Sequence, residues 1–329
     1  MIYLPVEVSE KNPTDSADSK RMKKTIILFN PSSGKGRAGR RKPELEQRLH
    51  SLGIPYELIV TRSEDHLKTL TAEKAPLCSI LAGAGGDSTF NIMINVMMQN
   101  KLTTPLAMFG LGSSNDVPKA FGLESLENAC LALKNGGIHT VDLGTVAQKG
   151  IILNYFIGQA NIGLGALVAE HVEKLSERKP HWGRRQTLAG ILAVFDTYRK
   201  HKIPFPLEVE ALDAHERGRY LTAVFNNTRY WATGKVLNPE SYPDDGMLDC
   251  CLIKECSLAR LARLYGLAGQ GRLEDAEEIT FLQSKSFTVS GTRAFTLQAD
   301  GEILGGFSRP SPFHRLEFKI IPLALNIIR

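Results

Sequence analysis

Short apolar and β-branched runs alternate with helical patterns from Thr25 to about Asn135, and this alternation constrains the fold more than any other feature of the sequence. Such an order is typical of a parallel β-sheet covered by helices on both faces. The sequence therefore predicts an α/β domain of three layers. The strand-like runs are TIILF, YELIV, LCSILA and LAMF, and the helical patterns between them cover 43–52, 63–74 and 89–99.

After Val141 the pattern changes to strand-like runs separated by polar, turn-rich segments. These runs are YFIGQ, FPLEVEA, YLTAVFNN, MLDCCLIK, SFTVS, AFTLQA and RLEFKII. They predict a mainly antiparallel β-sandwich. Helices are expected to interrupt it over about 166–200 and 257–267.

A chain of 329 residues is long enough for two domains. We expect a disordered polar tail over 1–22, the α/β domain over 23–146 and the β-sandwich domain over 147–329. The position of the last segment, 316–329, is open, with a return to the first domain as one option.

Three predicted strands of the first domain are followed by glycine-rich loops, which begin at Asn30, Gly83 and Gly110. Ligands of open parallel sheets bind beyond the carboxyl ends of the strands. Glycine allows the backbone to approach a phosphate, and the helix that follows presents its N–H groups. One such loop alone is more often structural, but three in succession favour phosphate binding. Their sequences are NPSSGKG, GAGGDST and GLGSSND.

Two familiar nucleotide motifs are excluded. A P-loop needs GxxxxGK[ST], but Gly36 follows Lys35 and no glycine stands at the required earlier position. The dinucleotide fingerprint GxGxxG fails at its last position in both later loops. Asp87 lies within a phosphate loop, where a carboxylate needs a divalent cation to offset its repulsion of the ligand, so magnesium is implied.

Net charge and cysteine content indicate which kinds of partner and which cellular compartment to expect for this protein. The formal net charge of +5 is a mild excess that suits an anionic small molecule or membrane surface and does not call for nucleic acid. The five cysteines have no CxxC or Cys/His spacing, so neither a disulfide framework nor a zinc site is indicated. A cytoplasmic protein is expected, with peripheral contact at the inner membrane face as one option; a homodimer is left open.

The motifs resemble those of the diacylglycerol kinase catalytic-domain family, which includes bacterial lipid kinases and sphingosine kinases. NPSSGKG, GGDST and GSSNDVPKAFGL are similar to the family's NPxSG, GGDGT and GTxNDFAxxLG motifs. In the second half, the segment from Asn238 to Asp249 resembles NPxAxxDDGxLDV, and Asp300-Gly301-Glu302 resembles DGE. The resemblance implies an ATP-dependent kinase that phosphorylates a hydroxyl of diacylglycerol or a similar lipid, with ATP and Mg²⁺ as cofactors.

The resemblance also implies a set of site residues. Glu302 would be the general base, with Asp300 beside it and Asp87 near the phosphates and magnesium. Asp245, with the main-chain carbonyls of Tyr242 and Met247, would form a second and more structural metal site. The nucleotide would be held by Asn30, Pro31, Ser32, Ser33, Gly34, Thr61, Gly85, Gly86, Asp87, Ser88, Thr89, Ser113, Asn115 and Asp116.

Ser88 replaces the second glycine of GGDGT, which would strain the backbone if its φ were positive. This departure motivates one alternative, a catalytically weakened nucleotide- or lipid-binding protein. Another alternative is an NAD-kinase-like or sugar-kinase phosphotransferase, since those kinases share a GGDGT-like loop. A basic amphipathic stretch over 174–202 would either rest on an anionic membrane that supplies the lipid substrate or pack on the sandwich with its charges in solvent.

Overall fold

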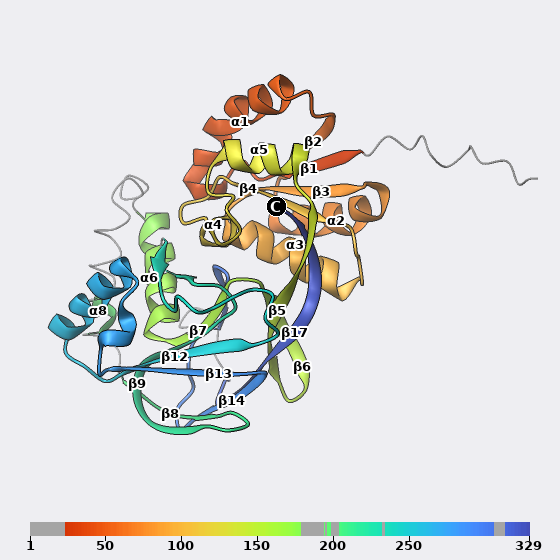
Figure 1. Ribbon diagram of the computed structural model, residues 1–329. Helices are drawn as coiled ribbons and strands as arrows, with labels where there is room; N and C mark the ends of the chain where they lie inside the picture. Colours follow the sequence, from red (N-terminus) through yellow and green to blue (C-terminus); the bar gives the residue numbers. More distant parts are fainter. Residues whose placement is uncertain (1–23, 179–193, 195, 199–203, 232–233, 306–312) are drawn as a thin grey trace, which may run out of the picture.

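A computed structural model describes residues 24–178, 194, 196–198, 204–231, 234–305 and 313–329. The predicted tail over 1–22 lies outside the described residues, as does most of the basic stretch after residue 178. The described chain forms an α/β half and a β-rich half (Figure 1).

The α/β half is built on four parallel strands in the order β2-β1-β3-β4. Helices α1 and α5 pack together on one face of this sheet, and α2 and α3 pack on the other (Figure 1). This arrangement confirms the predicted three-layer α/β fold. The elements are β1 (Thr25–Phe29), α1 (Ser33–Ser51), β2 (Tyr56–Val60), α2 (Glu64–Lys74), η1 (Ala75–Leu77), β3 (Ile80–Gly85), α3 (Asp87–Gln99), β4 (Leu106–Gly110), α4 (Asp116–Ala120) and α5 (Leu126–Asn135).

The burial of β1 and β4 helps to explain why this half is stable. Every residue of β1 and β4 is buried, as expected for strands covered by helices on both faces. Phe29 and Phe109 are completely buried side chains of this core.

The β-rich half consists of antiparallel strands, with β9 at its centre, where it pairs with β7, β8 and β12. Its core includes Phe225 and Phe318, whose rings stack with centroids 3.8 Å apart. The predicted β-sandwich class is confirmed. The strands are β5 (Ile138–Gln148), β6 (Ile151–Phe156), β7 (Gln159–Gly163), β8 (Phe205–Glu210), β9 (His215–Asn226), β10 (Tyr230–Trp231), β11 (Lys235–Val236), β12 (Leu248–Lys254), β13 (Ile279–Ser284), β14 (Ser286–Gly291), β15 (Leu297–Ala299), β16 (Glu302–Gly305) and β17 (Arg315–Ile328).

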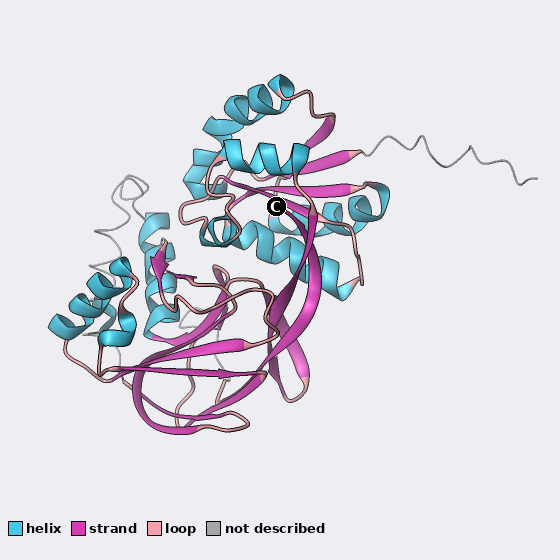
Figure 2. Ribbon diagram, in the orientation of Figure 1, coloured by secondary structure: helices cyan, strands magenta, loops and turns pink. Residues whose placement is uncertain are grey.

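Strand β17 joins the two halves into one sheet (Figure 2). It pairs antiparallel with β14 and β5, and near its end Ile327 pairs in parallel register with Leu106 of β4. The pairing with β5 shifts register between Ile321 and Leu325, where Leu323 has a positive φ. The last segment therefore does return to the first domain.

Three segments differ in detail from the sequence expectation. The run expected as one strand over 155–159 is instead a corner, because β6 ends at Phe156 and β7 begins at Gln159. Helix α6 (Leu164–Arg178) covers the start of the helix expected over 166–200, and residues 194 and 196–198 of that range are also helical. Helix α8 (Leu258–Gln270) runs three residues beyond the expected end and stops at Gly271, which has a left-handed φ of 69°; the short helix η3 (Leu273–Asp275) follows.

Candidate active site

The loops after β1 and β3 are joined by side chains that the sequence singled out. The Asn30 amide donates to the Thr89 hydroxyl over 3.1 Å, and the Ser33 and Thr89 hydroxyls are 3.2 Å apart. The Ser33 hydroxyl also accepts the main-chain N–H of Gly86. These contacts bring the first turn of α3 against the start of α1, as two parallel strands ending at one sheet edge require.

The loop after β4 lies against the other two and depends on glycine. A side-chain carbon at Gly112 would stand 2.4 Å from the Cα of Gly86, so neither a Cβ nor a larger group fits there. The carbonyl of Gly85 accepts the N–H groups of Leu111 and Gly112. All three predicted phosphate loops therefore meet at one place.

The first loop has an unusual backbone. Gly34, Lys35 and Gly36 all have positive φ, between 58° and 77°, inside the segment that begins α1. Such successive left-handed residues turn the main chain tightly, which favours glycine at Gly34 and Gly36. The Arg37 guanidinium then donates to the carbonyl of Gly112, which links this turn to the third loop.

Asp87 holds the start of α4. Its two carboxylate oxygens accept the main-chain N–H groups of Asp116 and Val117 over 3.2 and 3.1 Å. Burial, followed by the neighbouring Asp116 carboxylate, raises the pKa of Asp87 to about 7. Two carboxyl groups, those of Asp87 and Asp116, are thus close together beside the predicted phosphate loops.

Asp300 is buried and binds main chain. It accepts the N–H groups of the corner between β6 and β7, which comprises Ile157, Gly158 and Gln159, at 2.7–3.0 Å, with a longer second contact from Gly158. Its own backbone has a positive φ of 41°. Burial raises the pKa of Asp300 to about 6, although these hydrogen bonds oppose the shift. The geometry makes Asp300 the anchor of the turn that presents Glu302.

The turn of the DGE motif lies against the second phosphate loop. A side-chain carbon at Gly301, where φ is 92°, would stand 3.6 Å from the Cβ of Ser88 and 3.5 Å from its nitrogen. Glu302 follows as the first residue of β16 and is partly exposed. The predicted base therefore comes from a turn that abuts the N-terminus of α3.

Ser88 itself is not strained. It lies in the first turn of α3 and is not among the residues with positive φ. The observed backbone therefore shows none of the distortion that a Cβ at this position was expected to cause if φ were positive.

The predicted second metal loop is tied to the junction of the two halves by Asp142 of β5. This fully buried carboxylate accepts the N–H of Gly246 and the N–H of Leu323, both over 2.7 Å. Within the loop, Asp245 accepts the N–H of Met247 over 2.9 Å. Burial, and then the nearby Asp142 and Asp244 carboxylates, raise the pKa of Asp245. Sequence reasoning missed Asp142, which belongs to none of the motifs considered.

The remaining predicted site residues differ in position and exposure. Thr61 is buried after β2, and its hydroxyl donates to the carbonyl of Phe29. Asn115 adopts a left-handed conformation with φ of 56°, and its Oδ1 is buried without a hydrogen-bond partner. Ser113 is partly exposed between Gly112 and Asn115, whereas Tyr242 of the metal loop is exposed. The carbonyl of Pro31 accepts the N–H of Gly39, and the N–H of Ser32 donates to Asn30.

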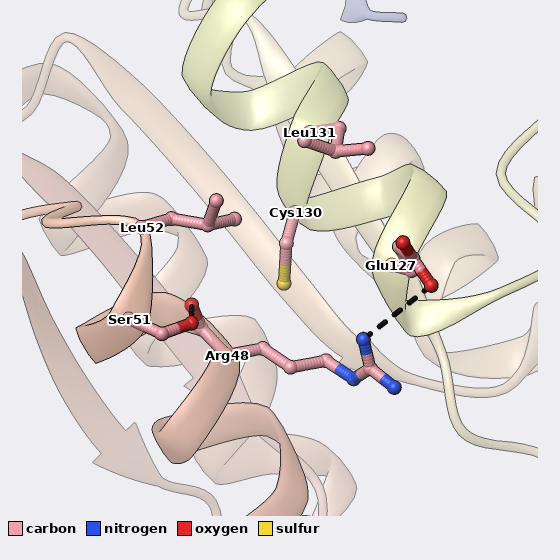
Figure 3. Close-up of a pocket in the computed structure, with 6 residues that line it drawn as sticks. All are labelled: Arg48, Ser51, Leu52, Glu127, Cys130 and Leu131. Carbon is pink, nitrogen blue, oxygen red and sulfur yellow. Dashed lines mark hydrogen bonds and ion pairs between the residues drawn. The ribbon is translucent and has the colours of Figure 1, made fainter.

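A separate small pocket lies between the C-terminal end of α1 and α5 (Figure 3). In it Arg48 reaches toward Glu127, 3.6 Å away, and Cys130 points inward. The lining contains none of the predicted site residues. Elsewhere, in the part of the chain that the structure covers, we find no helix with the length and apolar character needed to cross a membrane.

Comparison with known proteins agrees with this geometry. Residues 24–146 match the family model of the diacylglycerol kinase catalytic domain, and residues 158–329 match that of the YegS C-terminal NAD kinase beta sandwich-like domain. A diacylglycerol kinase of Mycobacterium tuberculosis is 26% identical over 309 residues, covering 93% of this chain and 95% of that protein. A diacylglycerol kinase of Bacillus subtilis is 24% identical over 288 residues, covering 86% and 91%.

Solved structures show the same fold. A crystal structure of a diacylglycerol kinase from Bacillus anthracis superimposes with a TM-score of 0.69 at 16% identity, over 94% of this chain and 98% of that chain. The two family models together span nearly the whole described chain. The chain belongs to the diacylglycerol kinase catalytic-domain family, and it is a kinase.

Proposed function

We propose that the protein transfers the γ-phosphate of ATP to a hydroxyl of diacylglycerol or a closely related lipid. The observation that carries this proposal is the closeness of Gly301 to Ser88, which brings the turn bearing Glu302 beside the second glycine-rich loop. Phosphoryl transfer needs positioning, charge neutralisation and one acceptor for a proton, and these groups can supply them. The relatives named diacylglycerol kinase support the choice of lipid.

In this mechanism the three glycine-rich loops bind the nucleotide phosphates through main-chain N–H groups and the N-terminus of α3. Glu302 takes the proton of the acceptor hydroxyl while the oxygen of that hydroxyl forms a bond to the γ-phosphorus. The bond from that phosphorus to the β–γ bridging oxygen breaks, and ADP leaves. Asp300 acts by holding the turn through the β6–β7 corner.

The donor set fits magnesium. Burial raises the pKa of the Asp87 carboxyl, and the nearby carboxylates of Asp116 and Asp300 raise it further; a divalent cation would relieve this repulsion. Among the described residues, however, the three side chains close enough to share one ion by themselves are Glu208, Glu210 and His215, which are far from these loops in sequence. Asp87 would therefore hold Mg²⁺ together with phosphate oxygens and water, as is usual for this ion. Bound Mg²⁺ would offset the charge of the transferred phosphoryl group.

The second proposed site uses Asp245 with the carbonyls of Tyr242 and Met247. The like charges of Asp142 and Asp244 beside Asp245 again suit a cation. Its role would be to fix the loop that Asp142 ties to β17. We also propose peripheral contact with a membrane, which the lipid substrate requires, and a cytoplasmic location.

The test is transfer of labelled phosphate from ATP into a chloroform-extractable product, with mixed micelles of diacylglycerol and with or without Mg²⁺. Product in the organic phase supports the lipid kinase. If NAD or a sugar is the acceptor and the labelled product stays in the aqueous phase, the result would instead support the NAD-kinase-like alternative. The second family model, whose description mentions NAD kinase, is the reason to include this test. Binding of ATP without any transfer would favour a catalytically inactive protein.

A further inference from the structure

The two halves of the protein are joined by a cluster of three asparagines between α3 and β6. Asn91 and Asn95 lie one turn apart on α3, and Asn154 lies on β6 (Ile151–Phe156). The Asn91 amide donates to Asn154 Oδ1 over 3.1 Å, and the Asn154 amide donates back to Asn91 Oδ1 over the same distance. Both side chains are buried, so these bonds form away from competing water.

Asn95 completes the cluster by pairing with main chain. Its Oδ1 accepts the N–H of Tyr155 over 2.9 Å, and its amide donates to the carbonyl of Tyr155 over 2.9 Å. The side-chain amide of Asn95 thus makes the two hydrogen bonds that the main chain of a neighbouring strand would make with Tyr155. This matters because, among the described strands, β6 pairs only with β5, which leaves Tyr155 on an open edge.

The position of the cluster connects both parts of the site. Helix α3 begins at Asp87 and carries the second phosphate loop at its N-terminus. Strand β6 runs directly into the corner whose N–H groups bind Asp300. The Asn91 side chain also lies close enough to Asp300 to oppose the rise in the pKa of that carboxyl. The same helix is therefore fixed to phosphate-binding residues at one end and to the support of Glu302 along its side.

We infer that Asn91 and Asn95 are positioning residues that hold the phosphate loop and the Asp300–Glu302 turn at the separation needed for transfer. This inference rests on the proposed kinase function. Removing either amide leaves buried polar partners of β6 unsatisfied and lets the two halves shift. Small displacements of the reacting groups lower the rate of phosphate transfer much more than they lower the affinity for the nucleotide, because the proposed nucleotide contacts lie within one half.

The experiment compares Asn95→Ala and Asn91→Ala with two controls in the same helix. Asn100→Ala, at the C-cap of α3, removes an amide whose hydrogen bond among the described residues goes to the carbonyl of Val96 in the same helix. Met97→Ala removes a completely buried apolar side chain of the first core and lowers stability without removing a polar group that bonds to β6. Hydrogen exchange at the Tyr155 amide, kcat, and KM for ATP with diacylglycerol micelles are measured for each variant.

We expect Asn95→Ala to lose protection of the Tyr155 amide and Asn91→Ala to keep more of it. Both should lower kcat by about tenfold or more with KM for ATP changed by less than about threefold, as expected for misplaced reacting groups. Neither control should lower kcat to that extent. The inference is overturned if Tyr155 stays protected in Asn95→Ala, or if Met97→Ala lowers kcat equally.

The exchange measurement separates this inference from the proposed function. If the wild-type protein transfers no phosphate to lipid, the kinase proposal fails, and with it the catalytic part of the inference. Protection of Tyr155 then still decides whether Asn95 holds β6. Loss of protection with unchanged transfer would show docking without a positioning role and would overturn the inference.

Discussion

Gly301 faces Ser88 across a gap in which a single added side-chain carbon would stand 3.5–3.6 Å from Ser88, so the turn preceding Glu302 lies close beside the first turn of α3. The turn comes from the β-rich half, and α3 comes from the α/β half. The two residues therefore mark the point at which the two halves of the site meet.

Glu302→Gln should abolish phosphate transfer while leaving ATP binding intact. Loss of a general base typically costs about 10²- to 10⁴-fold in rate, and the amide cannot accept the proton. Labelled-phosphate transfer and equilibrium binding of ATP are the measurements. Glu274→Gln, on an exposed residue of η3, is the matched control and should retain normal rates. Normal transfer by Glu302→Gln would remove Glu302 from the mechanism.

Ser88→Gly should not restore or raise activity. Ser88 is helical and unstrained in α3, so a glycine relieves nothing and costs about 0.5–1 kcal/mol of folding free energy. We expect kcat to change by less than about threefold, since no reacting group moves, and the thermal midpoint to fall slightly. A large rise in kcat would instead support the catalytically weakened alternative.

Two substitutions of Asp87 should separate its role in capping from its charge. Asp87→Ala removes both acceptors for the N–H groups of Asp116 and Val117, and should cost about 0.5–2 kcal/mol, as lost helix caps do. Asp87→Asn keeps one acceptor oxygen but no charge. We expect Asp87→Asn to be the more stable variant and both to need more Mg²⁺ for transfer. Unchanged Mg²⁺ dependence in Asp87→Asn would contradict a role in metal binding.

Stability should depend on pH through Asp300. Its folded-state pKa of about 6 exceeds the ordinary value of 3.8, so the fold favours the protonated carboxyl. This contribution to stability is complete below about pH 4 and is lost as the pH rises through about 6. Asp300→Asn, which cannot titrate, should show a smaller fall in the free energy of unfolding over that range. Denaturant titrations at several pH values without Mg²⁺ would measure it, and equal slopes in both proteins would argue against the assignment.

The sequence was sufficient to predict the layers and the three glycine-rich loops, because the alternation of strands and helices and the positions of the glycines follow from local pattern. The loops at Asn30, Gly85 and Gly112 meet because parallel strands end at one edge. Asp142 could not be predicted in this way. Its partners, Gly246 and Leu323, are distant in sequence and contribute only main-chain N–H groups, which carry no residue signature.

The asparagine cluster was also missed, for a similar reason. Asn91 and Asn95 are spaced to share a helix face, but the identity of the opposing surface depends on how the two halves pack. Ile157 and Gly158 were expected to lie within a strand, because an apolar residue and a glycine are compatible with a strand as well as with a corner. Three N–H groups bound by Asp300 are what bend it, and that partner is also remote in sequence.

The contact of Ile327 in β17 with Leu106 in β4 has a consequence for biosynthesis. The open edge of β4 gains this neighbour only after the whole β-rich half has been translated. On the ribosome, the α/β half must wait with an uncovered strand until the end of the polypeptide emerges. A fragment ending near residue 146 would retain that uncovered edge permanently and would be prone to self-association in the cell.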